Sequence, residues 1–138
     1  MFKIWDMKKA DEMFSKYIRK RDGRCKHPEC SRKYDTDITQ MQNSHFYGRG
    51  EWATRYDPDN CDTAHKGCHY FKWEKTKNSD YLQFKKKQLG TKRFNALTKK
   101  VNDSKKFGGG VRHSDEIIKC MNFLRDVGFV DAEFKIIK

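Results

Sequence analysis

The sequence has no apolar run close to the roughly 18 to 20 residues that a transmembrane helix requires. It also lacks the apolar core of a signal peptide, because charged residues recur throughout positions 1–14. No internal repeat is visible along the 138 residues, a length typical of one domain with a single core. These absences predict an intracellular protein that has no membrane partner and folds as one compact domain with appendages.

Acidic residues are in the minority, with 19 of them against 31 lysines and arginines and a formal net charge of +12. The basic residues are interleaved with aromatic residues and are not confined to a tail. A surface of this charge attracts polyanions. The composition therefore indicates a nucleic acid such as DNA as the partner.

The five cysteines form a pattern that argues against disulfides, because thiols of an intracellular chain stay reduced. Cys25 and Cys30 form a C-x4-C pair, and His65 and Cys68 form an H-x2-C pair further along the chain. Three thiolates and one imidazole match a closed tetrahedral structural zinc site. Gly67 would let the backbone of the second pair bend toward the ion. The spacing therefore predicts a zinc ion that staples the N-terminal helix and its loop onto the core.

Other assignments of the same residues stay open at this point. Cys61 or His27 could replace His65 as a ligand, and all the paired cysteines could be ordinary buried thiols. Cys120 lies on the apolar face of an expected helix, so we expect a core thiol there.

The hydrophobic pattern predicts helices and one hairpin. Apolar spacing and capping residues indicate helices over residues 6–20, 65–75, 79–90, 91–101 and 114–127. Extended segments over residues 38–46 and about 54–62 indicate a hairpin with a long loop. The predicted division is a nuclease-type domain over 1–101, a glycine-rich linker over 102–113, and a C-terminal helix and tail over 114–138.

Two histidines and an asparagine form a second group of candidate residues. We expect His45 at the end of the first strand, Asn60 in the second, and His69 at the start of the next helix, so that both imidazoles face one cleft. Phosphodiester hydrolysis needs a base that takes a proton from water and a cation that neutralises the phosphoryl and departing 3′ oxygens. His45 suits the first task, His69 could hold Mg²⁺ or Mn²⁺, and the Asn60 amide could tie the loop and orient the base.

The segment from Asn60 to His69, which contains His65 and Cys68, resembles the signature of HNH nucleases. More narrowly, residues 14–22, 45–50 and 55–57 are similar to segments of the NinG/Rap family of phage recombination endonucleases. The resemblance covers about residues 8–101. It implies an α+β protein with a ββα-metal (HNH, treble-clef-like) core, a zinc staple, and flanking helices at both ends.

The resemblance also implies an activity, the divalent-metal-dependent cleavage of DNA, with branched recombination intermediates such as Holliday junctions and D-loops as preferred substrates. His45 would be the general base, Asn60 the orienting residue, His69 the ligand of the catalytic ion, and Arg49 a phosphate clamp. Junction cleavage calls for two active sites on opposed strands, which suggests a homodimer. For a phage-encoded protein, the location would be the host cytoplasm.

Basic residues at the predicted cleft and on the two helices that follow it are candidate DNA contacts. They are Arg49, Arg55, Lys85, Lys86, Lys87, Lys92 and Arg93. A solvated helix face is the alternative interpretation of each single run of charges.

Three positions depart from the family pattern. Ser44 stands where many HNH enzymes carry an aspartate that binds the metal, so His69, water and substrate phosphate would have to hold the ion. His69 occupies a position where the NinG-like pattern often has asparagine, and His65 replaces the usual cysteine.

A different class of function uses the same features. A non-catalytic, zinc-stapled module that binds nucleic acid needs the charge, the aromatic residues and the zinc ligands, but it does not need His45, Asn60 or His69. A structural or packaging component of a virion makes no use of these three residues either.

Overall fold

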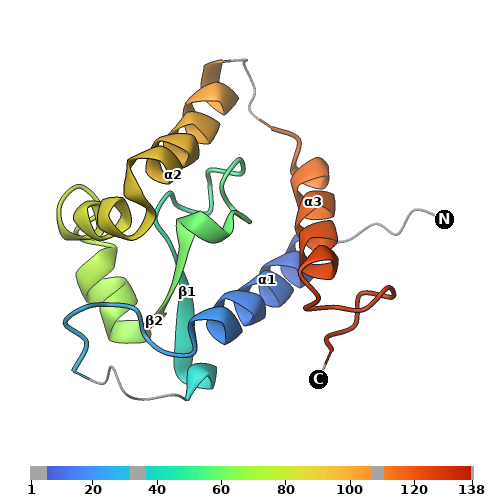
Figure 1. Ribbon diagram of the computed structural model, residues 1–138, viewed down its shortest axis with the longest axis horizontal. Helices are drawn as coiled ribbons and strands as arrows, with labels where there is room; N and C mark the ends of the chain where they lie inside the picture. The colour runs from blue at the N-terminus through green and yellow to red at the C-terminus, as the bar shows by residue number, and fades with distance from the viewer. Residues whose placement is uncertain (1–5, 32–36, 107–110, 138) are drawn as a thin grey trace.

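A computed structural model describes residues 6–31, 37–106 and 111–137 and places several helices around a small sheet (Figure 1). The longer helices and the strands follow in the order α1 Met7–Asp22, β1 Met41–His45, β2 Cys61–His65, α2 Asp80–Lys106 and α3 His113–Asp126. Between them lie the 3₁₀ turns η1 Ile38–Gln40 and η2 Pro58–Asn60 and the π-helical segment η3 Cys68–Trp73. The architecture is α+β, with a two-stranded antiparallel sheet, as the sequence predicted.

The hairpin formed by β1 and β2 lies at the centre of the molecule (Figure 1). His45 pairs with Cys61 at one end of the ladder, which extends one step further because the amide of Phe46 donates to the carbonyl of Asn60 at 2.8 Å. All five residues of β2 are buried, because both faces of this strand are covered. Cys61 packs with α1 and α3, whereas Ala64 packs with α2.

Helix α1 presents one apolar face to the first of these two cores. Asp6 caps its N-terminus by accepting from the amide of Lys9 at 2.7 Å, and Gly23 ends it with a φ of 70°. Helix α3 packs against α1, and the tail that follows adds Phe129 and Val130 to the same core. The C-terminal helix and tail therefore share the core of α1.

Helix α2 bends sharply at Gly90, where φ is 77° and ψ is 169°. Two helices that meet at this glycine were predicted, and the kink confirms the break. The second half continues to Lys106, so residues 102–106 of the predicted linker are helical. The three glycines of this linker, at 108–110, lie outside the described residues.

The segment before β2 differs from the prediction of an extended strand from about Thr54. The chain forms turns and then the 3₁₀ turn η2, because Pro58 has a restricted φ and the Asp57 side chain accepts from the amide of Asp59 at 2.9 Å. Only from Cys61 onward does the backbone pair as a strand.

The predicted helix over 65–75 also begins too early. His65 is the last residue of β2, and helical backbone starts only after it. Gly67 has φ −64° and ψ −43°, which any residue adopts, so the bend expected of this glycine is absent.

None of the helices in the described ranges combines the length and the apolar character that crossing a bilayer would require.

Candidate functional site

Four buried side chains from three segments of the chain converge on one point. The ligating atoms of Cys25, Cys30, His65 and Cys68 all lie within 4.8 Å of one another. Cys30 Sγ is 3.2 Å from His65 Nδ1, and the amide of His65 donates to Cys25 Sγ at 3.3 Å. Ligands of one tetrahedral zinc ion lie about 3.5 to 4 Å apart, so this donor set fits such an ion. The cluster could hold zinc, as the spacing predicted, and would join the loop after α1 to β2 and η3.

The two alternative ligands lie elsewhere. Cys61 is fully buried in the core beside α1 and α3. His27 packs on the ring of Trp73, and its Nδ1 atom accepts from the amide of Glu29 at 3.1 Å. Cys120 is buried in the core, as expected.

Without an ion, Cys25 and Cys68 of this cluster favour the protonated thiol. Burial and the neighbouring thiols raise the pKa of Cys68 to about 12, and burial also raises the pKa of Cys25. A bound metal cation reverses this preference, because it stabilises the thiolates directly.

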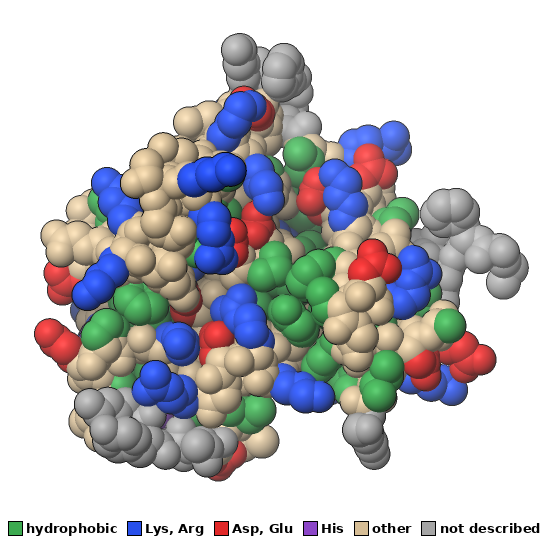
Figure 2. Space-filling view, in the orientation of Figure 1, with side chains coloured by type: hydrophobic (Ala, Val, Ile, Leu, Met, Phe, Trp, Pro, Cys, Tyr) green, Lys and Arg blue, Asp and Glu red, His purple; other side chains and the backbone are tan. Residues whose placement is uncertain are grey.

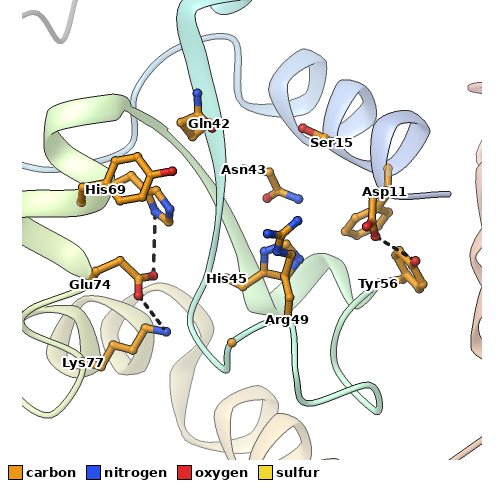
Figure 3. Close-up of a pocket in the computed structure, with 13 residues that line it drawn as sticks. Asp11, Ser15, Gln42, Asn43, His45, Arg49, Tyr56, His69, Glu74 and Lys77 are labelled. Carbon is orange, nitrogen blue, oxygen red and sulfur yellow. Dashed lines mark hydrogen bonds and ion pairs between the residues drawn. The ribbon is translucent and has the colours of Figure 1, made fainter. Parts of the chain in front are cut away.

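A second feature is an open cavity of about 490 Å³ between α1, β1, the loop after β1, and η3. Figure 3 shows that His45 and Arg49 approach it from the hairpin and His69 and Glu74 from the opposite wall. The prediction that His45 and His69 face one cleft from two sides is confirmed by this arrangement.

His45 is held in a defined orientation at the end of β1. Its Nε2 atom is 3.0 Å from the carbonyl oxygen of Arg55, and because a carbonyl only accepts, Nε2 carries the hydrogen and Nδ1 has a free lone pair. Burial above all, with the nearby cations of Arg49 and Arg55, lowers the pKa of His45 to about 4. A neutral imidazole with one accepting nitrogen is what a general base requires.

Asn60 acts on this arrangement through the loop that connects the strands. Its side-chain oxygen accepts from the amide of Tyr47 at 2.8 Å, and its nitrogen donates to the carbonyls of Tyr47 and Thr54 at 2.9 and 3.1 Å. Asn60 therefore ties the loop together, as expected, but its hydrogen bonds go to the loop and not to the imidazole of His45.

The same loop is anchored on α1 by a contact that the sequence reasoning missed. Arg55 donates to both carboxylate oxygens of Asp11, at 3.0 and 2.6 Å, and to the carbonyl of Arg49 at 2.8 Å. The hydroxyl of Tyr56 donates to Asp11 at 2.8 Å. Because the carbonyl of Arg55 holds His45, the Asp11–Arg55 pair positions the imidazole indirectly.

His69 lies on the other wall, between the buried Ser44 and the carboxylate of Glu74, which also lines the cavity. Its Nδ1 atom is 3.1 Å from Ser44 Oγ and 3.9 Å from Glu74 Oε1. Burial lowers the pKa of His69, which favours the neutral form that a metal ligand needs. Glu74 was not among the predicted site residues.

Asn43 adds a polar atom with no partner to the same cavity. Its side-chain oxygen is buried and has no hydrogen bond to any residue in the described part of the chain. Buried acceptors are usually satisfied, so this oxygen is an exception behind the wall of the cavity.

Two of the predicted DNA contacts are wrong, because the structure buries them. Lys85 is fully buried and donates to Asp62 Oδ2 at 3.1 Å and to Gln88 Oε1 at 2.8 Å. Arg55 is committed to Asp11 and is only 6% exposed. Neither side chain can reach a phosphate outside the molecule.

The remaining predicted contacts are exposed. Arg49 lies at the edge of the cavity, and the others project from α2: Lys86, Lys87, Lys92 and Arg93. Figure 2 shows Lys and Arg side chains along the region where α2 lies. Arg93 also pairs with Asp59 at 2.5 Å.

Lys85 should matter for stability and not for DNA binding. Lys85→Met would leave the carboxylate of Asp62 charged and buried without its cation, so we expect it to lower the free energy of unfolding by about 3 to 5 kcal/mol. The exposed neighbour offers a matched control, since Lys86→Met should change it by less than about 0.5 kcal/mol. Urea unfolding at saturating zinc measures both, and equal stability of the two variants would contradict the prediction.

No known protein family, curated protein or solved structure significantly matches this chain. The interpretation of both sites therefore depends on their own geometry and chemistry.

Proposed function

We propose that this protein is a divalent-metal-dependent DNA endonuclease whose active centre is the cavity lined by His45 and His69. The observation that carries the proposal is the shared cavity of these two imidazoles, one held by the Arg55 carbonyl with its Nδ1 atom free to accept. A hairpin, the helical segment after it and the adjacent Cys/His cluster also support a ββα-metal arrangement for this centre.

In the proposed reaction, His45 Nδ1 takes a proton from a water molecule whose oxygen attacks the phosphorus. The bond from phosphorus to the 3′ oxygen breaks, and the departing oxygen takes a proton from solvent. Arg49, exposed at the edge of the cavity, can hold a phosphate of the substrate in place.

Mg²⁺ or Mn²⁺ is the cofactor that we propose for the cavity, and His69 the residue that holds it. His69 fits this role, because it lines the cavity and burial lowers its pKa, which favours the neutral imidazole that a metal ligand needs. When bound, the ion would neutralise charge on the phosphate and on the departing oxygen.

Branched recombination intermediates such as Holliday junctions and D-loops are the substrates that we propose, on the basis of the resemblance to the NinG/Rap family. The exposed basic residues of α2 could contact the phosphates of the arms. Paired cuts on opposed strands would be made by the two active sites of a homodimer.

A nicking assay tests the proposal. Zinc-loaded protein is incubated with supercoiled plasmid in buffer depleted of divalent ions, with and without added Mg²⁺ or Mn²⁺, so that the zinc stays bound. We expect nicked circles only when metal is added, and faster cutting of a synthetic four-way junction than of the matched linear duplex. DNA binding without nicking in any metal would favour the non-catalytic module instead.

A further inference from the structure

The carboxylate of Glu74 lies beside His69 on the same wall of the cavity (Figure 3). The two oxygens of Glu74 have different neighbours, since Oε1 is 3.9 Å from His69 Nδ1 and Oε2 is 3.4 Å from Lys77 Nζ. The backbone joins the same two residues, because the amide of Glu74 donates to the carbonyl of His69 at 2.9 Å.

The π-helical segment explains why Glu74 lies in the cavity. In an α-helix, positions five residues apart are rotated by about 140° around the axis, so His69 and Glu74 would point in different directions. A π-turn closes its hydrogen bond between residues i and i+5, which brings position 74 to the same face as position 69, much as i and i+4 share a face in an α-helix. Such turns are rare and occur frequently at functional sites.

We propose that Glu74 is the second protein ligand of the catalytic divalent cation. This inference rests on the proposed function, because that function supplies the need for a cation beside His69. Glu74 would contribute the negative charge that the neutral imidazole of His69 does not provide.

The distance between His69 and Glu74 is compatible with a shared hard cation. Ligands of one octahedral ion with bonds of about 2.1 Å lie about 3 Å apart as neighbours and about 4.2 Å apart on opposite sides. The separation of 3.9 Å between His69 Nδ1 and Glu74 Oε1 lies between these two values. Water and substrate phosphate would complete the coordination, as they commonly do for Mg²⁺.

Glu74 is also the more available of the two carboxylates that line the cavity, because only its Oε2 atom pairs with a lysine. Among the lining residues that the structure describes, the other acid is Asp11, and both of its oxygens already accept from Arg55 or Tyr56. The side chain of Glu74 is 36% exposed, so a cation arriving from solvent can reach it.

The test measures Mn²⁺ binding, in addition to cleavage, with the full-length, zinc-loaded protein. Electron paramagnetic resonance counts bound Mn²⁺ in the wild type and in Glu74→Gln, each with and without a short DNA duplex. Glu51→Gln is the matched control, because Glu51 is also partly exposed and pairs with a lysine, Lys105, at 3.3 Å outside the cavity. Zinc content and circular dichroism check that all variants are folded.

We expect Glu74→Gln to weaken Mn²⁺ binding about tenfold or more, and to raise the Mn²⁺ concentration for half-maximal nicking by a similar factor. Glu51→Gln should leave both quantities unchanged. Wild-type affinity in Glu74→Gln would overturn the inference, as would a wild-type protein that binds no Mn²⁺ in either state. If Mn²⁺ binds through Glu74 but the wild type never nicks DNA, the inference stands and the proposed endonuclease function fails.

Discussion

Cys68→Ser is expected to unfold the protein, the largest effect on stability that we expect of any single substitution. Cys68 is one of four buried donors within 4.8 Å of one another, and together they connect the loop after α1, strand β2 and η3. Structural zinc binds such sites with an apparent free energy of about 10 to 16 kcal/mol, whereas a whole domain is stable by about 5 to 15 kcal/mol. Losing the ion should therefore remove most or all of the stability.

Metal analysis and circular dichroism measure this effect. The wild type should contain about one Zn²⁺ per chain, and a strong chelator should unfold it. Cys120→Ser is the control with the same chemical change, because Cys120 is equally buried but lies in the other core. It should lower stability by only about 1 to 3 kcal/mol and keep the zinc. A folded Cys68→Ser variant, or a folded wild type without zinc, would contradict the prediction.

The metal-binding cluster could be predicted from the sequence because ligand chemistry restricts the choices strongly. Few arrangements satisfy three thiols and an imidazole together, and short spacings within each pair bring both members to one point. The helices α1 and α3 were predictable for a similar reason, since an apolar stripe and a glycine just after the helix agree in each.

The prediction that Lys85 contacts DNA is wrong, although the sequence contains a pattern that indicates its burial. Tyr81, Lys85 and Leu89 follow one another at four-residue intervals, so they share one face of α2, and that face is buried. The run of three lysines suggested a solvated surface and obscured this pattern. The partner of Lys85, Asp62, comes from β2 and could not be deduced, because no local rule connects a strand to a helix 23 residues away.

Glu74 and Asp11 were missed for different physical reasons. A helix was assumed to have α-helical spacing, and under that assumption His69 and Glu74 do not share a face; only the π-turn brings them together. Asp11 meets Arg55 across 44 residues, and this contact depends on how the loop after β1 folds back on α1. Tertiary packing decides such contacts, and one sequence alone does not reveal it.

His45→Ala is expected to lower the rate of nicking by about 10²- to 10⁴-fold, because a general base acts in the transition state. Zinc content and DNA affinity should stay close to those of the wild type, since the metal cluster and the basic residues of α2 are elsewhere. His45→Gln fills the space better and should be equally inactive, which separates loss of the base from loss of packing. Single-turnover nicking of supercoiled plasmid measures the rate.

Two further variants show whether activity is lost through the base or through the metal ion. His113→Ala removes an exposed imidazole that stacks on Trp52 away from the cavity, so this control should cleave like the wild type. His69→Ala should also be inactive, but through weakened metal binding. Excess Mn²⁺ should partly restore His69→Ala and should not restore His45→Ala, because a metal ion cannot supply the missing base.

The pH dependence of DNA cleavage is a second test of the proposal that His45 is the general base. The pKa of His45 is lowered to about 4 by burial, so the imidazole stays neutral and able to accept a proton well below pH 6.5. At about pH 5.5, an ordinary imidazole of pKa about 6.5 would be about nine-tenths protonated and inactive as a base. We therefore expect kcat/KM at saturating Mg²⁺ to change little between pH 7 and about pH 5.5, and to fall only as the pH approaches the lowered pKa. Near wild-type cleavage by His45→Ala, or an acid limb centred near 6.5, would show that His45 is not the base.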